Sequence, residues 1–298
     1  MADFILCPMI QVSDLFPDKP STIQTVVEPP HGWFRFRPVE LWNYRYLIAL
    51  FVYRDFVIYY KQTILGPLWW LIQPLFAAGV FTIVFSMAAK IPTDEIPPPL
   101  FYFCGLIFWN YYASCLSQIS RVLLDNRDVL GKVYFPRLVI PIALVLSNLL
   151  RWSVQAILFV LIYAVYWIRG ASIQPNIFLS LLPLVMAYLL LLGLGSGLLV
   201  AAVTVRYRDL VLAIPFLTQL GMLISTVIVP LSAVPESWRF WCALNPMIVP
   251  IELFRMMTLG TGIVSWTAVL IDLFLLGFIL LLGLGLFSRA EQTFADAV

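Results

Sequence analysis

Long apolar runs separated by short polar connections dominate the chain from residue 64 onward. A helix needs about 20 apolar residues to cross a hydrocarbon core of about 30 Å, so each long run predicts one membrane-spanning helix. Six runs qualify, at residues 64–89, 100–124, 138–168, 177–203, 211–232 and 265–287. The pattern therefore predicts an all-α membrane protein with six transmembrane helices.

Composition excludes several other classes of protein. Of the 298 residues, 62% are hydrophobic and only 11% are charged, whereas soluble domains carry about 25% charged residues. The net charge is +2 and no block of like charges occurs, so nucleic acid is not an expected partner. The four cysteines form no paired spacing and His31 is the single histidine, so we expect no metal or cofactor in this chain.

Basic residues indicate the orientation, because lysine and arginine resist translocation. With the N-terminus in the cytoplasm, 13 of the 18 basic residues lie on the cytoplasmic side and four lie outside. Arg151 lies within a predicted span. We therefore expect both termini of this multi-pass protein in the cytoplasm.

Two segments depart from simple spans. Residues 38–63 predict an amphipathic interfacial helix in contact with membrane lipids, with Arg54 and Lys61 on one side and Trp42 and Tyr53 opposite. A soluble helix packed on the chain itself is the alternative. Residues 1–37 predict a cytoplasmic N-terminal extension. Between spans five and six, two short apolar runs are broken by prolines. They predict an outer re-entrant helical hairpin, with a surface loop as the alternative.

Few residues could carry chemistry. The segment 126–133 lacks the first glycine and the hydroxyl of a nucleotide-binding loop, so ATP hydrolysis would need a second polypeptide. Asp125 and Asp128 are the nearest approach to an acidic cluster and more simply form local helix pairs, which disfavours a membrane enzyme. Arg151 and Asp272 lie deep in their spans at similar depth, so an ion pair between them is possible. Alternatively, Arg151 faces a cavity or substrate and Asp272 binds backbone.

Aromatic residues gather toward the predicted outer ends of spans two and three, where tyrosine and tryptophan commonly anchor membrane proteins. Aromatic faces also stack on sugar rings, so a minority of these residues is expected to line a conduit. The conduit candidates, with a neighbouring arginine, are Phe103, Trp109, Tyr112, Arg151 and Trp152.

Four segments in order resemble a known family. They are RDFVIYYKQTILGPLWWLIQPL (54–75), DNRDVLGKVYFPRLVIP (125–141), TVRYRDL (204–210) and NPMIVPIELFR (245–255). Together they are similar to the ABC-2-type permeases that export O-antigen, teichoic acid or capsule. Residues 64–298 would then form the six-span transmembrane domain.

The resemblance implies a homodimer in a bacterial inner membrane, bound to a separate ATPase subunit that holds ATP and magnesium. The substrate would be a lipid-linked polysaccharide, most simply O-antigen on polyprenyl diphosphate. A capsule or teichoic-acid exporter and an ion-coupled secondary carrier remain as alternatives.

The resemblance also implies roles for three groups of residues. The residues that would couple to the ATPase are Asp125, Arg127, Asp128, Lys132, Tyr134, Arg137, Arg206, Tyr207, Arg208 and Asp209. The gate helix and its hinge would comprise Arg54, Asp55, Tyr60, Lys61, Gly66 and Pro67, with Pro74 further weakening the helix. The outer re-entrant region would comprise Asn245, Pro246, Glu252 and Arg255.

Overall fold

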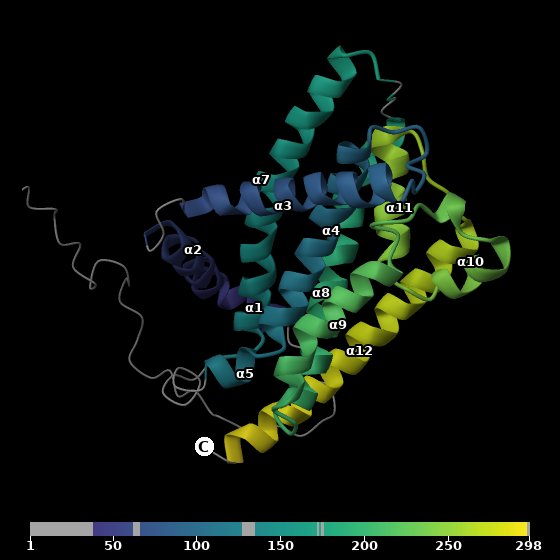
Figure 1. Ribbon diagram of the computed structural model, residues 1–298. Coiled ribbons are helices and arrows are strands. Elements are labelled where there is room, and N and C mark those ends of the chain that lie inside the picture. The colour runs from purple at the N-terminus through teal and green to yellow at the C-terminus, as the bar shows by residue number, and fades with distance from the viewer. Residues whose placement is uncertain (1–37, 62–65, 127–134, 172, 174–175, 297–298) are drawn as a thin grey trace, which may run out of the picture. The chain divides into compact units, whose positions relative to one another are not determined.

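The computed structural model describes residues 38–61, 66–126, 135–171, 173 and 176–296, and the predicted extension 1–37 lies outside them (Figure 1). Within these ranges the chain is helical and contains no strand, as predicted. The α-helices are α1 (Pro38–Asn43), α2 (Arg45–Lys61), α3 (Trp69–Phe81), α4 (Pro98–Ile119), α5 (Val122–Asp125), α7 (Val139–Ile168), α8 (Leu182–Thr204), α9 (Leu210–Ile224), α10 (Glu236–Cys242), α11 (Ile248–Leu259) and α12 (Trp266–Asp296). Shorter turns are η2 (Gly66–Leu68), η3 (Thr82–Ala88, a π-helix), η4 (Ile177–Leu181) and η5 (Leu231–Ala233).

Helix α4 forms the centre of the bundle. It packs against α3, α7, α8, α9 and α11 (Figure 1). Every residue from 100 to 109 is buried. Its aromatic rings fill the core. The ring of Phe103 stacks on that of Phe159 of α7 with 6.4 Å between the ring centroids, and the centroids of Phe108 and Phe254 of α11 are 4.5 Å apart. The other helices are therefore arranged around a helix that is surrounded by protein.

Four described helices are long and apolar enough to cross a membrane, at Trp69–Ala88, Val139–Ile168, Phe178–Thr204 and Trp266–Glu291. They match the first, third, fourth and sixth predicted spans. Helix α4 has 22 residues but includes Asn110, Gln118 and three tyrosines, which suits a helix that faces protein. Helix α9 is shorter than predicted. It ends at Ile224 instead of residue 232 because Ser225 adopts an extended conformation.

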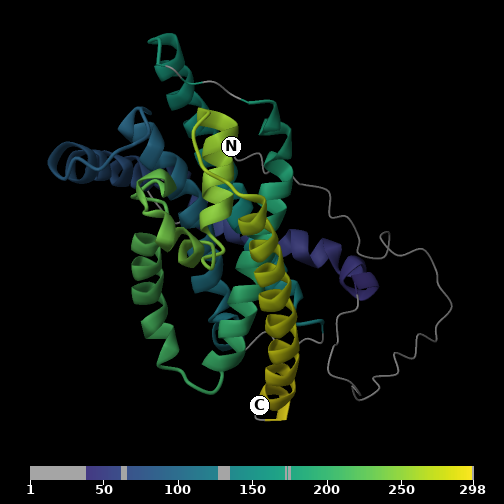
Figure 2. The same cartoon turned by 90° about the vertical axis from the view of Figure 1, so that its right-hand side faces the viewer.

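Connections that are predicted to share a side of the membrane contact one another. On the predicted outer side, Ser232 donates to Asp94 at 2.6 Å, and the amide of Asn176 donates to the carbonyl of Met257 at 2.9 Å. On the other side, Arg137 reaches Glu291 near the C-terminus. Figure 1 accordingly shows α5, the α8–α9 connection and the C-terminus at the lower end, and Figure 2 shows the last two there.

Glycine residues let α8 and α12 pack backbone to backbone (Figure 2). A Cβ atom on Gly283 of α12 would collide with the carbonyl oxygen of Gly195, and one on Gly195 would lie 2.9 Å from the Cα of Leu280. Small residues favour close helix association in membranes, where lipid is as apolar as leucine and cannot drive helices together. The glycine contact thus fixes the spacing of these two helices.

The predicted interfacial helix 38–63 is two helices, α1 and α2, with a break at Tyr44; residues 62 and 63 lie outside the described ranges. One side, including Leu41 and Phe51, is buried, and α2 packs against α7. The other side exposes aromatic residues, among them Trp42 and Tyr53. Both sides are therefore largely apolar, which differs from a simple division into a polar and an apolar face.

We expect Gly283→Ala to destabilise the protein by roughly 1–3 kcal/mol or more, because the added methyl group meets backbone that cannot rotate away. The thermal unfolding temperature of the detergent-purified protein measures this loss. Gly277→Ala on the same helix is the matched control, since a Cβ atom there meets nothing within 4 Å. Equal stability of the two variants would contradict the tight α8–α12 contact.

Candidate functional site

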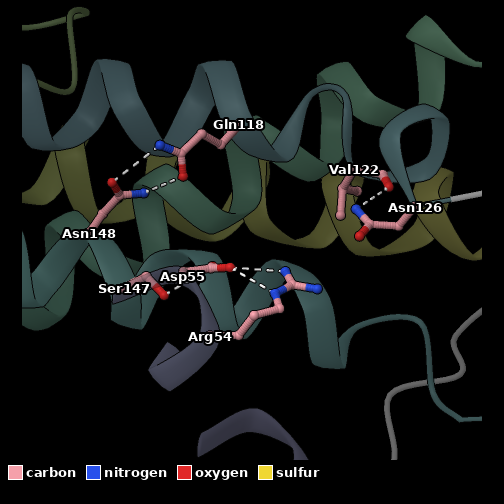
Figure 3. Close-up of polar contacts among 7 residues, drawn as sticks. All are labelled: Arg54, Asp55, Gln118, Val122, Asn126, Ser147 and Asn148. Carbon is pink, nitrogen blue, oxygen red and sulfur yellow. Dashed lines mark hydrogen bonds and ion pairs between the residues drawn. The ribbon is translucent and has the colours of Figure 1, made fainter. Parts of the chain in front are cut away.

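Polar side chains on α7 connect this helix to two neighbours (Figure 3). Ser147 donates to Asp55 of α2 at 3.3 Å, and Asp55 also forms an ion pair with Arg54 at 2.9 Å. The next residue, Asn148, exchanges two side-chain amide hydrogen bonds with Gln118 of α4, at 3.0 and 3.5 Å. Helix α7 is therefore pinned to the predicted gate helix on one side and to the central helix on the other.

Arg151 lies one turn beyond Ser147 on α7. Its guanidinium stands 5.4 Å from the ring centroid of Trp70 on α3, and it lines a cavity of about 10 Å³ together with Asp55 and Ser147. Such a volume corresponds to about one water molecule. Arg151 thus belongs to the contact region of α2, α3 and α7.

Asp272 of α12 faces a different neighbour. Its carboxylate accepts a hydrogen bond from Tyr188 of α8 at 3.4 Å, and the same hydroxyl lies 3.0 Å from the carbonyl of Pro246. Among the described residues, the ion pairs do not include one between Arg151 and Asp272. The possible ion pair is therefore not formed between these two described side chains, because equal depth in the membrane does not make two helices face each other.

Glu252 and Arg255 form a buried ion pair on α11. Their side chains are 3.0 Å apart and no more than 2% exposed. The guanidinium also donates to the carbonyl of Val227 at 3.3 Å and lies 3.7 Å from the ring centroid of Phe101. Gly105 of α4 makes room for it, since a Cβ atom there would lie 3.2 Å from the arginine Nη2. Two residues predicted for the outer region thus join α11 to the core.

The other two predicted outer residues set the start of α11. Asn245 donates to the hydroxyl of Ser225 at 2.9 Å and accepts from the amide of Met247 at 3.1 Å. Pro246 contributes the carbonyl that Tyr188 contacts. The structure therefore brings together the segment after α9, the start of α11 and helix α8.

The predicted coupling residues occupy the other end of the bundle. Arg137 donates to the carbonyl of Glu291 at 2.7 Å, and Arg121 pairs with Asp125 at 3.6 Å. Arg206 lies 5.7 Å from the ring centroid of Tyr207. Arg206, Tyr207, Arg208 and Asp209 are all exposed. Arg127, Asp128, Lys132 and Tyr134 lie outside the described residues.

The predicted gate and conduit residues are placed as follows. Gly66 is buried with a φ of 48°, a left-handed conformation that favours glycine. Lys61 is exposed, while the side chains of Tyr60 and Pro67 lie outside the described residues. The conduit candidates Phe103, Trp109 and Trp152 are buried within this chain and Tyr112 is partly buried. A role in a conduit requires these side chains to be uncovered, and it stays a prediction.

Reading the sequence missed the polar partners Ser147, Asn148, Gln155 and Tyr188. A detectable signal existed, because Ser147, Arg151 and Gln155 follow one another at intervals of four residues and so share one face of α7. A polar line of this kind in an otherwise apolar span indicates a helix contact.

We expect Glu252→Gln to destabilise the protein by about 3–5 kcal/mol, because it leaves the buried Arg255 without its counter-charge. Unfolding temperature of the purified protein is the measurement. The control is Glu236→Gln, which removes the carboxylate from a pair of the same spacing with Arg239 at 3.7 Å; Glu236 is 91% exposed, so we expect a change below about 1 kcal/mol. A similar effect at both positions would contradict the importance of burial.

Comparison with known proteins places this chain in a family. Residues 46–259 match the ABC-2 type transporter model. The chain is 30% identical to an O-antigen export system permease protein of Myxococcus xanthus, over 70% of this chain and 78% of that one. It is 24% identical to a Klebsiella pneumoniae protein of the same description, over 86% and 97%, and 24% identical to the polysialic acid transport protein KpsM of Escherichia coli, over 64% and 72%.

The matched region begins in α2 and ends at the last residue of α11, so it contains the α2–α7 contact, the buried ion pair and all of the predicted coupling residues. Its helices include three of the four that are apolar enough to cross a membrane. The chain is a multi-pass membrane protein and belongs to the ABC-2 type transporter family.

Proposed function

We propose that this chain is the membrane-spanning subunit of an ATP-driven exporter that moves a lipid-linked polysaccharide out of the cytoplasm. The observation that carries the proposal is the family match, together with relatives from two organisms that are described as O-antigen export permeases. O-antigen on a polyprenyl diphosphate carrier is the first substrate candidate. The relative that is described as a polysialic acid transport protein supports a capsule polymer as the second.

The proposed topology has six spans, formed by α3 with η3, α4, α7, α8, α9 and α12. The side on which each contact lies supports this topology. The bonds Ser232–Asp94 and Asn176–Met257 join segments at the predicted outer side, and the Arg137–Glu291 pair joins segments at the cytoplasmic side. The side that carries Arg137 and Glu291 also has the surplus of basic residues, which favours both termini on the cytoplasmic side of a bacterial inner membrane.

Two short helical regions complete the proposed topology. Helices α10 and α11 would form a re-entrant pair at the outer side, since both are too short to cross. Helices α1 and α2 would lie at the cytoplasmic interface. In support, Arg45 stands 4.6 Å from the ring centroid of Tyr46 and 5.6 Å from that of Trp42, and both rings are exposed. Aromatic and basic side chains are typical of the headgroup layer.

The work of transport would come from a separate ATPase subunit, which would bind ATP and magnesium. Two copies of the permease would enclose the path of the polymer. The coupling surface would be formed by residues 125–137 and 206–209. Closure of the ATPase pair would push these segments and tilt the helices attached to them, as rigid elements do in other switching proteins.

A deletion experiment tests the function. In a strain that lacks this chain, we expect the lipid-linked glycan to accumulate on the cytoplasmic side and the surface polymer to disappear, with recovery when the chain is supplied. Labelled lectin before and after permeabilisation distinguishes the two sides. Normal surface display in the deletion strain would overturn the proposal.

Charge reversal tests the coupling surface. Arg208 is exposed within the α8–α9 connection. We therefore expect Arg208→Glu to lower the amount of ATPase subunit that co-purifies with the permease by roughly five-fold, because rim charges steer association. The matched control is Arg169→Glu, also exposed but in a connection predicted to face outward. Equal losses for both variants would argue against the assigned sides.

A further inference from the structure

A proline interrupts the backbone hydrogen bonds of α3, the first proposed span. Pro74 lies inside this helix and has no N–H group, so the carbonyl oxygen of Trp70, four residues earlier, loses its usual donor. Within a bilayer no bulk water is available to replace that donor, so a neighbouring helix, a side chain or an ordered water must supply one.

Gln155 of α7 supplies the missing donor. Its Nε2 atom donates to the carbonyl oxygen of Trp70 at 3.1 Å, and the side chain is only 5% exposed. The bond joins two residues that are 85 positions apart in the chain and lie on different helices. It therefore does two things at once, since it satisfies the backbone of α3 and fixes this helix to α7.

Gln155 is the last of three polar residues on the same face of α7. Ser147 holds Asp55 of the proposed gate helix, Arg151 lies against the ring of Trp70, and Gln155 holds the backbone of that residue. One face of α7 thus carries polar contacts to both α2 and α3. Helix α7 begins at Val139, directly after the proposed coupling segment, so movement of that segment would reach both helices through this face.

We propose that Gln155 is a positioning residue for export: its bond to Trp70 fixes the first span to α7 at the proline. The proposal rests on the function proposed above. The Gln155 bond has two effects: it attaches α3 to α7, and it gives the Trp70 carbonyl a hydrogen-bond donor. The proposal requires that the attachment itself is needed for export.

A double-mutant cycle separates these two effects. Pro74→Ala restores an N–H group that can pair with the Trp70 carbonyl. In this background Gln155→Leu no longer leaves that carbonyl without a donor, but it still removes the bond between α3 and α7. Gln155→Leu is made in the wild-type chain and in the Pro74→Ala background. The unfolding temperature reports the backbone penalty, and surface glycan per folded permease reports export.

We expect Gln155→Leu to lower the unfolding temperature in the wild-type chain but not in the Pro74→Ala background. Export should fall by roughly ten-fold in both backgrounds, the factor that accompanies loss of one buried hydrogen bond. If the export defect also disappears in the Pro74→Ala background, Gln155 only completes α3 and the positioning role is overturned. If the stability loss persists there, the account of the bond itself is overturned.

Gln118→Leu is the matched control, because Gln118 pairs with Asn148 on another face of α7 and its hydrogen bonds among the described residues do not involve the proline break. Its stability loss should be the same in both backgrounds, and rescue by Pro74→Ala would overturn the specificity of the cycle. If the wild-type chain exports no glycan, the proposed function and the export role fail together, while the unfolding temperatures still test the bond between Gln155 and Trp70.

Discussion

The lack of water inside the bilayer is the constraint on which the arrangement of this protein depends. Polar groups that leave water must find partners in the chain, and here many of those partners lie on other elements. Asn148 satisfies Gln118, the hydroxyl of Tyr188 reaches Asp272, and Arg255 is held by Glu252 and a carbonyl of the segment after α9. Each of these contacts allows one helix orientation and excludes others, so a few polar residues define how mostly apolar helices pack.

The lengths and order of the helices could be predicted from the sequence, because hydrophobic length is a one-dimensional property. The first, third, fourth and sixth runs correspond to helices that are long enough to cross a membrane. The end of α9 could not be predicted. Residues 225–232 are apolar enough to continue a helix, but Ser225 turns the chain and brings the carbonyl of Val227 to Arg255. That turn depends on a partner that is 28 residues away.

The rotation of each helix about its own axis could not be predicted from the sequence either. Depth alone suggested a pair between Arg151 and Asp272, but Arg151 faces α3 and Asp272 faces α8. The aromatic run in α4 looked like an interfacial belt, whereas Phe101, Phe103 and Phe108 are buried because protein surrounds that helix. In the candidate site, the charged members of α2, α11 and the coupling segment were predicted. Their uncharged partners on α7 and α8 were not, since serine, asparagine and glutamine have no strong motif.

The glycine contact between α8 and α12 has a mechanical consequence. With backbone against backbone at Gly195 and Gly283, no flexible side chain separates the two helices and neither can slide without a collision. We therefore expect the two helices to move together as one rigid body. At one end of the pair, the α8–α9 connection lies beside the C-terminal part of α12. Tyr188 and Asp272 lie together further along the two helices. A displacement at the first end would then rotate both helices together and move the second end, with little bending in between.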